Sequence, residues 1–570
     1  MKGYEKESFL APLFKMLEAT FELIVPLVVA NIMDIGIKNQ DNAYIWHQCV
    51  IMVLLGVIGL VCALTAQYFS AKAAMGFSTA LRKEMFAHIS KLSYRELDQL
   101  GTPTLVTRIT NDVNQAQTGV NMVLRLFLRS PFIVVGAVIM SFTIDWKIGL
   151  IFLIAVPLIS VVIYAIMRTT VPIYKKAQSS LDRISLITRE NHVGARVVRA
   201  FGRQQEEYKE FSQVNDDYTK VQVTAGKISA LLNPATTVIM NFAIIGILWY
   251  GSKEVSIGTL RQGEVVALVN YMNQILIALI ALANLIVAVT KAMASGVRLN
   301  EVLDTQPSLT DEGSSTQQEK AKADRVAFED VSFTYAGSKE PALSHISFTA
   351  KPGETIGIIG GTGCGKSTLV NLIPRFYDAS EGSVVIDGNN AKEYPFSQLR
   401  KKVGMVPQQA VLFKGTIRDN MKWGKEDATE EEIQRALSIA QASDFVNSKP
   451  EGLNTMVSQG GANLSGGQRQ RLTIARALVG DPEILIMDDS ASALDFATDA
   501  ALRHAIHQQT KGMTVFIVSQ RATSIKQADK ILVLDDGELV GVGTHKELME
   551  SCEVYREICL SQLSEQEVNR

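Results

Sequence analysis

Apolar runs dominate the first half of the chain. Six of them, at residues 10–35, 46–69, 124–144, 148–167, 231–250 and 265–289, are each close to the ~20 residues that cross a bilayer core as a helix. Lys15, Glu18, Glu22 and Asp34 interrupt the first run, so it lacks the clean apolar core of a signal peptide. The pattern therefore predicts six membrane-spanning helices.

Positive charge is unevenly distributed over the segments that join these runs. Basic residues gather between the second and third runs and between the fourth and fifth, whereas the other joining segments carry only Lys38, Lys147, Lys253 and Arg261. Because cytoplasmic loops carry the excess of Lys and Arg, both long segments and both termini are expected in the cytoplasm. Residues 180–211 are rich in helix formers, so the long segments should extend the spanning helices.

The apolar pattern ends after Arg298. Residues 304–324 (DTQPSLTDEGSSTQQEKAKAD) are polar and aperiodic, as is typical of a linker. From residue 325 to 570, short β-rich runs alternate with helical stretches, which predicts a soluble α/β domain with a largely parallel sheet. We expect an all-α transmembrane domain of six helices at 1–303, a linker at 304–324 and an α/β domain at 325–570.

Composition agrees with such a mixed protein. Hydrophobic residues make up 47% of the 570 residues and charged residues 20%. The net charge of −2 argues against nucleic acid as a partner, because neutralising phosphates requires a clustered excess of Lys and Arg. The five cysteines lack metal-binding spacing, which predicts reduced thiols and no disulfide framework.

The first candidate for chemistry is GGTGCGKST, at residues 360–368, which stands between a predicted strand and a predicted helix. Its glycines let backbone N–H groups face phosphates, Lys366 reaches the β and γ oxygens, and Ser367 offers a hydroxyl to Mg²⁺. This pattern predicts a P-loop NTPase. The predicted ligands in the loop are Gly360, Gly361, Thr362, Gly363, Cys364, Gly365, Lys366, Ser367 and Thr368.

Two further motifs accompany the phosphate loop. ILIMD, at 484–488, is a buried strand that ends on Asp488, which is placed to hold Mg²⁺ beside Ser367. LSGGQ precedes a predicted helix and offers a second anion-binding helix start. Because the phosphate loop already serves this chain's nucleotide, the second start is expected to serve another phosphate. Its residues are Leu464, Ser465, Gly466, Gly467 and Gln468.

Together these motifs resemble those of the ATP-binding cassette (ABC) family, and six spans followed by one cassette resemble an ABC exporter half-transporter over nearly the whole chain. The resemblance implies that two cassettes dimerise head to tail, each ATP lying between one phosphate loop and the other subunit's LSGGQ. It assigns Tyr335 to stacking on adenine and Gln408 to sensing the γ-phosphate and Mg²⁺, although Tyr335 could also be a core residue. It assigns the loops at 94–112 and 190–201 to coupling helices. It assigns contact across the dimer to Ser492, Ala493, Leu494 and Asp495.

Two positions depart from the resembled family. Where rapidly hydrolysing members have a glutamate that deprotonates the attacking water, this chain has Asp489, and where they have a histidine it has Gln520. A single conservative substitution could be neutral drift. Two substitutions in the same pocket indicate a site that binds ATP without readily hydrolysing it. We therefore expect a heterodimer whose second half-transporter carries Glu and His there. Gln459, where the family has an acidic residue, is a further departure.

The candidate substrate residues are Glu18, Glu22, Asn241 and Asn273 in the apolar runs. Glu18 and Glu22 share a helix face and could attract cationic amphiphiles in a central cavity. The preferred alternative is that Lys15 satisfies them. The resemblance implies ATP and Mg²⁺ as cofactors, a lipid bilayer as environment and hydrophobic drugs or lipids as exported substrates. Open alternatives are a membrane-bound regulatory ATP-binding subunit, a peptide exporter and a soluble NTPase on a membrane anchor.

Overall fold

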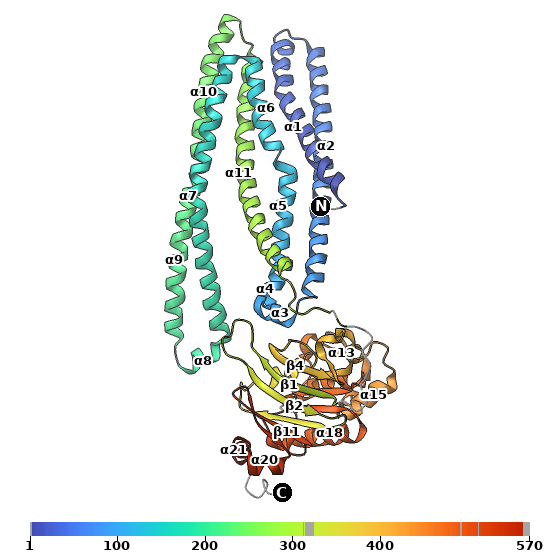
Figure 1. The fold of residues 1–570 in the computed structure, drawn as a ribbon. Helices are drawn as coiled ribbons and strands as arrows, with labels where there is room; N and C mark the ends of the chain where they lie inside the picture. Colours follow the sequence, from blue (N-terminus) through green and yellow to red (C-terminus); the bar gives the residue numbers. More distant parts are fainter. Residues whose placement is uncertain (1–2, 312, 314–323, 491–492, 511, 563–570) are drawn as a thin grey trace. The chain divides into compact units, whose positions relative to one another are not determined.

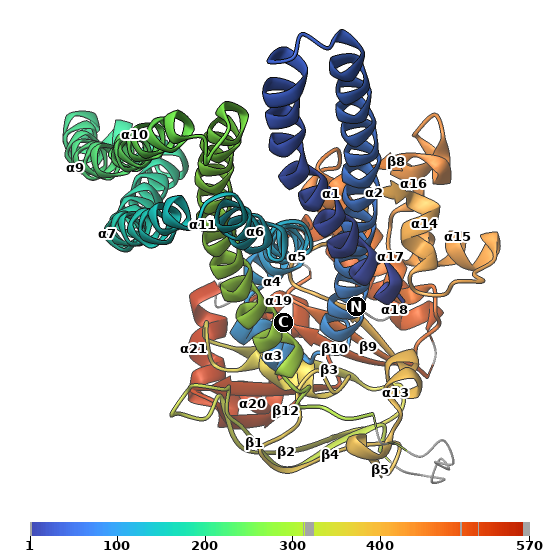
Figure 2. The same ribbon diagram turned by 90° about the horizontal axis from the view of Figure 1, so that it is seen from above.

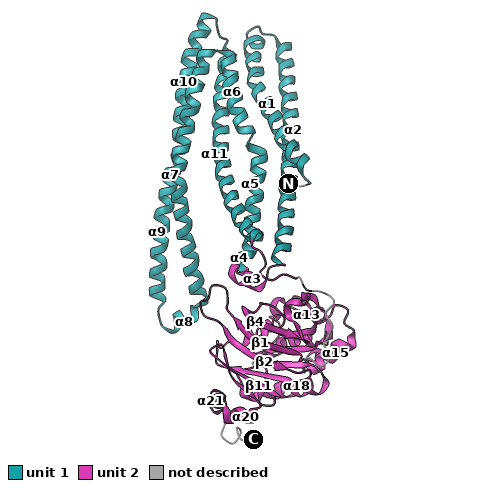
Figure 3. Cartoon of the chain, viewed as in Figure 1, with its two compact units in different colours: residues 1–90, 103–304 teal, residues 91–102, 305–570 magenta. Residues whose placement is uncertain are grey.

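The chain forms two compact units, coloured teal and magenta in Figure 3. The computed structural model describes residues 3–311, 313, 324–490, 493–510 and 512–562. The first unit comprises residues 1–90 and 103–304, and the second comprises residues 91–102 and 305–570. Most of the expected linker, 304–324, lies outside the described residues.

Long helices make up the first unit (Figure 1). Within the part of the chain that the structure describes, six helical segments are long and apolar enough to cross a membrane, which confirms the six predicted spans. The helices are α1 (Glu5–Asn31) with the π-helical turn η1 (Ile32–Ile37), α2 (Asn42–Ile89), α4 (Thr102–Thr107), η2 (Arg108–Asp112), α5 (Val113–Leu126), α6 (Arg129–Ile144), α7 (Trp146–Val193), α8 (Ala195–Ala200), α9 (Gln204–Ala230), α10 (Leu232–Ile257) and α11 (Gln262–Asp304).

Helix lengths confirm that the spans extend beyond a bilayer core. Helices α2 and α7 have 48 residues each, or about 72 Å at ~1.5 Å per residue, against a core of ~30 Å. Aspartate caps fix where both begin, because Asp41 accepts from Tyr44 N and Asp145 accepts from Lys147 N and Ile148 N. Seen from above, α7, α9 and α10 group together while α1 pairs with α2 (Figure 2).

Small residues and a buried ion-pair network hold α11 against the neighbouring helices. A methyl group added at Gly119 on α5 would lie 2.2 Å from Ala292 Cβ on α11, so the two backbones approach as closely as glycine permits. The carboxylate of Asp112, 4% exposed, accepts hydrogen bonds from Arg108 (2.9 Å), Ser295 (3.0 Å) and Arg298 Nε (3.0 Å). Every charge in this network therefore has a partner, as burial requires.

The second unit contains a six-stranded sheet in the order β12-β11-β3-β10-β9-β6. All its neighbours pair in parallel except β11 and β12, which confirms the largely parallel sheet. A separate antiparallel sheet, β2-β1-β4-β5, was not foreseen. The strands are β1 (Val326–Phe333), β2 (Leu343–Ala350), β3 (Thr355–Gly360), β4 (Glu381–Ile386), β5 (Asn389–Asn390), β6 (Val403–Val406), β7 (Gly415–Thr416), β8 (Met456–Val457), β9 (Ile484–Asp488), β10 (Thr514–Val518), β11 (Lys530–Asp535) and β12 (Glu538–Gly543).

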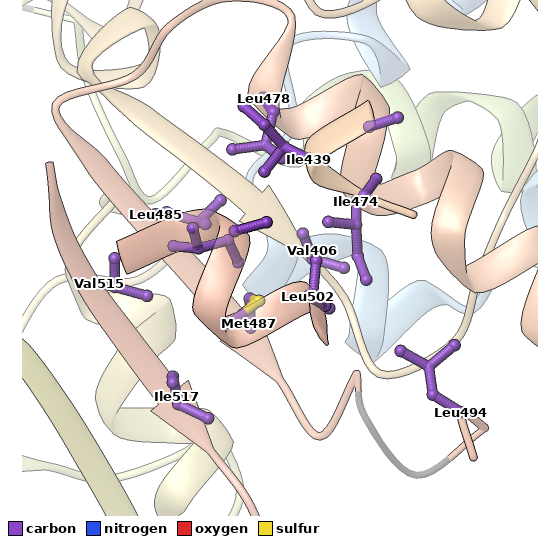
Figure 4. Close-up of a cluster of buried hydrophobic side chains, with 14 of the residues drawn as sticks. Val406, Ile439, Ile474, Leu478, Leu485, Met487, Leu494, Leu502, Val515 and Ile517 are labelled. Atoms are coloured by element: carbon purple, nitrogen blue, oxygen red, sulfur yellow. The ribbon is translucent and has the colours of Figure 1, made fainter. Parts of the chain in front are cut away.

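Helices of the second unit pack on this sheet, and Figure 4 shows part of the resulting core. Leu485 and Met487 of β9 and Val515 and Ile517 of β10 lie there with Ile474 of α17. The helices are α3 (Tyr94–Leu100), α12 (Lys366–Leu372), α13 (Phe396–Lys402), α14 (Ile417–Lys422), α15 (Glu430–Ile439), α16 (Ser443–Asn447), α17 (Gly466–Leu478), α18 (Phe496–Gln509), α19 (Ala522–Ile525), α20 (His545–Ser551) and α21 (Glu553–Gln562).

Helix α3 belongs to the second unit although it follows a membrane helix in sequence. The ring of Tyr94 lies 4.7 Å from that of Phe376, and Tyr377 OH donates to Asp98 Oδ2 at 2.6 Å. Ser93 Oγ also accepts from Leu309 N at 3.1 Å. An aromatic contact and two hydrogen bonds thus attach this short helix to the sheet-containing unit.

Replacing Gly119 by leucine should force α5 away from α11. Because overpacking costs about 1–3 kcal/mol, we expect a lower thermal unfolding temperature for the detergent-solubilised protein. The matched control is Gly56→Leu, since a methyl group there meets nothing within 4 Å. Equal unfolding temperatures for the two variants would show that the close approach of α5 and α11 is not a constraint.

Candidate nucleotide-binding site

The phosphate loop follows β3 and leads into α12. Gly363 (φ +89°) and Gly365 (φ +94°) adopt left-handed backbone angles that favour glycine. At Gly365 a Cβ would also lie 2.6 Å from the carbonyl oxygen of Ala342. Lys366, 8% exposed, donates from Nζ to the carbonyl oxygens of Gly360 (2.9 Å) and Gly361. The loop therefore curls around its own lysine, next to a helix N-terminus that favours anions.

The acid at the end of β9 lies beside this loop. Ser367 Oγ donates to Asp488 Oδ1 at 3.0 Å, because the parallel pairing of β3, β10 and β9 aligns their carboxyl ends. Burial raises the pKa of Asp488, and the hydrogen bond from Ser367 opposes that rise only in part. A nearby cation would offset the cost of burying this carboxylate.

These oxygens fit Mg²⁺, which binds proteins through one or two carboxylates together with phosphate oxygens. Among the described residues no group of three or more His, Cys, Asp and Glu side chains could hold a metal ion by itself. Ser367 and Asp488, with Gln408 nearby in the same cavity, therefore form an incomplete set that a nucleotide's phosphates would complete.

A cavity of about 400 Å³ brings most of the predicted nucleotide ligands together. This volume lies within the range of small-molecule sites, roughly 300–1,000 Å³. The predicted residues that line it are Tyr335, Thr362, Gly363, Gly365, Lys366, Ser367, Thr368, Gln408, Asp488, Asp489 and Gln520. Ala342, Val518 and Ser519 also line it and were not predicted, although Val518 and Ser519 directly precede Gln520.

The two departing residues occupy the same cavity. Asp489 has a left-handed backbone (φ +44°) and donates from its backbone N to Val518 O at 3.0 Å, which places it directly beyond the strand. Burial raises the pKa of the Asp489 carboxyl, while Lys366, Arg521 and Gln408 act in the opposite direction. Arg521 was missed in the sequence, although it directly follows Gln520.

Tyr335 lines the cavity. Its hydroxyl is 3.0 Å from Thr368 Oγ1, and its ring lies 4.8 Å from Phe333 and 5.5 Å from Tyr377. These two supporting rings were not predicted from the sequence. The Tyr377 hydroxyl also donates a hydrogen bond to Asp98 of α3, so continuous contacts run from the cavity to that helix.

The LSGGQ residues are not among those that line this cavity. Ser465 caps α17 by accepting from Gln468 N at 3.3 Å, while Gln468 Oε1 accepts from Ser465 N at 3.1 Å. A Cβ at Gly467 would lie 3.2 Å from Ala493 O, so the LSGGQ helix start adjoins the predicted dimer loop. In that loop Asp495 caps α18 and Leu494 is 6% exposed, while Ser492 lies outside the described residues.

Among the candidate substrate residues, Lys15 pairs with one of the two acids, as the preferred alternative expects, and a different cation pairs with the other. Lys15 pairs with Glu18 at 2.5 Å, but Glu22 pairs with Arg129 of α6 at 2.8 Å. Arg129 was not predicted as a partner of Glu22. Asn273 donates to Val269 O of its own helix, and Asn241 is exposed on α10.

Comparison with known proteins agrees with this geometry. Residues 8–279 match the family described as ABC transporter transmembrane region, and residues 343–492 match the family described as ABC transporter. The chain is 37% identical over 562 residues to YfiB of Bacillus subtilis, described as an ABC transporter ATP-binding protein, covering 99% of this chain and 97% of YfiB. It is 35% identical over 468 residues to an ATP-dependent lipid A-core flippase of Desulfotalea psychrophila, covering 82% and 81% of the two chains.

A bacterial Atm1-family ABC exporter, whose structure has ATP bound, shares the fold with a TM-score of 0.80 at 24% identity, and the match covers 99% of both chains. The six spans and these relatives indicate a multi-pass cell-membrane protein with its nucleotide-binding domain in the cytoplasm. With a membrane region, a cassette and full-length relatives all matched, the chain belongs to the ABC transporters, as an exporter half-transporter that fuses one membrane domain to one cassette.

Proposed function

We propose that this chain is the hydrolysis-impaired half of a heterodimeric ABC exporter for hydrophobic or amphipathic compounds, drugs or lipids. The observation that carries the proposal is that Asp489 and Gln520 line one cavity with Lys366, Ser367 and Asp488. Both departures therefore act on the same nucleotide. The binding residues around them remain complete.

The chemistry of the two side chains explains the impairment. Asp489 is one methylene shorter than glutamate, so its carboxylate lies about an ångström further from the attacking water. A displacement of that size can lower a rate about 100-fold. Gln520 donates a hydrogen bond but carries no charge near neutral pH, so it gives the γ-phosphate less electrostatic support than a protonated histidine would.

The binding role rests on the remaining residues. Lys366 supplies positive charge to the β and γ phosphates, the backbone N–H groups around Gly363 and Gly365 bind phosphate oxygens, and Tyr335 stacks on the adenine. Bound Mg²⁺ would be held by Ser367, Gln408 and Asp488 and would neutralise phosphate charge. Nucleotide retained there keeps the two cassettes together while the other nucleotide turns over.

The intact LSGGQ supplies the second part of the proposal. Ser465 and Gln468 lie outside this chain's own cavity, and the N-terminus of α17 favours an anion. In a head-to-tail pair of cassettes these residues complete the partner's site, where a glutamate and a histidine perform hydrolysis.

Exposed apolar side chains also lie around α8, namely Val193 (81%), Val197 (59%) and Phe201 (76%). Such a surface is expected to be covered by another chain in an assembly.

The proposed coupling role of α3 and the proposed substrate class have their own support. The contacts from Tyr335 through Tyr377 to Asp98 support the assignment of α3 as a coupling helix that transmits cassette closure to the spans. The flippase relatives are described as acting on lipid A-core, which supports an amphipathic substrate. Closure would switch the substrate path from inward to outward access.

Lengthening the acid should restore hydrolysis. We expect Asp489→Glu to raise ATP turnover of the self-assembled chain by up to about 100-fold, and Asp489→Glu with Gln520→His to raise it further. Phosphate release from the purified full-length protein measures both. Asp489→Asn, which keeps the length of the side chain and removes the base, is the matched control. Rapid hydrolysis by the unsubstituted self-assembled chain would contradict the proposal.

Removing the Ser465 hydroxyl should impair hydrolysis of the ATP bound at the partner's site. In the complex with the partner half, we expect Ser465→Ala to lower ATP turnover at least about tenfold, the size of one charge-assisted hydrogen bond. The matched control is Thr429→Ala, because Thr429 caps α15 with the same capping box. If both variants lose activity equally, helix capping rather than phosphate binding explains the loss.

A further inference from the structure

The loop that follows β10 carries Gln520 into the nucleotide cavity. Its backbone leaves the sheet at Ser519, whose N–H donates to Ile358 O at 3.1 Å, and regular structure resumes at Ala522, the first residue of α19. Arg521 occupies the N-cap position of α19 without a side-chain capping hydrogen bond. The N–H groups at the start of a helix have no acceptors within that helix, so their partners come from outside it.

The side chain of Gln562 holds this loop at two backbone atoms. Gln562 Oε1 accepts from Ala522 N at 2.9 Å, and Gln562 Nε2 donates to Gln520 O at 2.7 Å. One amide group therefore bridges the backbone on both sides of Arg521. The two hydrogen bonds join residues 40 and 42 positions apart in sequence, so this clamp exists only in the folded chain.

Gln562 has a fixed position because it ends a packed helix. Helix α21 buries Tyr555 and Cys559 completely, in the same core cluster as Ala522 and Ile525 of α19. The two helices adjoin one another (Figure 2). His545 Nδ1 lies 2.8 Å from the Tyr555 hydroxyl, which joins α20 to α21. The loop is thus attached, through Gln562, to the core of the second unit.

We propose that Gln562 is a positioning residue for the nucleotide, which fixes the backbone at 520–522 and thereby aims the Gln520 side chain at the terminal phosphate. Glutamine is uncharged, so it holds phosphate by a hydrogen bond, whose strength falls steeply with length and angle. The Coulomb attraction of a protonated histidine falls only as the inverse of distance. A chain with glutamine at this position therefore depends more on the aim of the loop, which the clamp provides.

The inference rests on the proposed function, in which Gln520 faces the γ-phosphate, and deepens it by adding a residue outside the site. Among the described residues that line the cavity, Gln562 is absent. It can therefore act on the nucleotide only through the loop. Its loss should weaken the binding of a nucleotide with three phosphates and spare one with two, whereas general destabilisation of the domain would weaken both.

Nucleotide discrimination tests the clamp. The full-length chain in mild detergent is titrated calorimetrically, in the presence of Mg²⁺, with AMP-PNP, a non-hydrolysable ATP analogue, and with ADP. Gln562→Met keeps the length of the side chain and removes both hydrogen bonds. We expect it to weaken AMP-PNP binding about fivefold, the size of one hydrogen bond, and to leave ADP binding within about twofold.

The matched control is Ser561→Ala, which removes a hydrogen bond of the same helix turn, from Ser561 Oγ to Ile558 O, that does not reach the loop. It should leave both affinities unchanged. If Gln562→Met does not fold, Gln562→Glu takes its place, because it keeps an acceptor for Ala522 N and opposes Gln520 O with a carboxylate. It must then lower the ratio of AMP-PNP affinity to ADP affinity.

A second substitution separates positioning from a merely structural role. In Gln520→Ala the side chain to be aimed is missing, so adding Gln562→Met should not lower the affinity ratio further. Equal weakening of both nucleotides, an unchanged ratio, or a further fall on the Gln520→Ala background would each overturn the inference. AMP-PNP does not turn over, so rapid ATP hydrolysis by this chain, which would contradict the proposed function, leaves this test unaffected.

Discussion

The parallel pairing of β3, β10 and β9 is the constraint on which the nucleotide site depends. Parallel strands bring their carboxyl ends to one edge, and this places the phosphate loop after β3 beside Asp488 after β9. Gln520 reaches the same cavity because it follows β10, the strand between them. Residues far apart in sequence thus meet through the backbone hydrogen bonds of the sheet, and a change in that register would separate the Ser367 hydroxyl from the Asp488 carboxylate.

The membrane unit obeys a different constraint, the absence of water around its helices. Backbone groups must be satisfied within each helix, and helices must associate without a hydrophobic driving force between them. The chain meets both conditions with aspartate caps at α2 and α7, with the close approach at Gly119, and with charges that pair across helices, as Asp112 does with Arg298. The Asp112–Arg298 pair therefore joins two particular helix segments, η2 and α11.

Short sequence patterns predicted the features that depend only on residues close together in the chain. Glycine spacing located the phosphate loop, apolar length located the spans, and N-cap preference located the start of α17 at Ser465. What could not be predicted depends on which elements become neighbours. Glu22 and Arg129 are 107 residues apart, and periodicity assigns a residue to a helix face without naming the helix opposite. For the same reason the aromatic rings around Tyr335 and the attachment of α3 appear only in the folded chain.

The reciprocal hydrogen bonds between Ser465 and Gln468 leave the first turn of α17 already ordered in the isolated subunit. A surface that is rigid before it meets its ligand loses little conformational entropy on association. In the proposed pair of cassettes, this face would dock and release many times with little rearrangement of its own. The energy of nucleotide binding would then remain available to move the membrane helices.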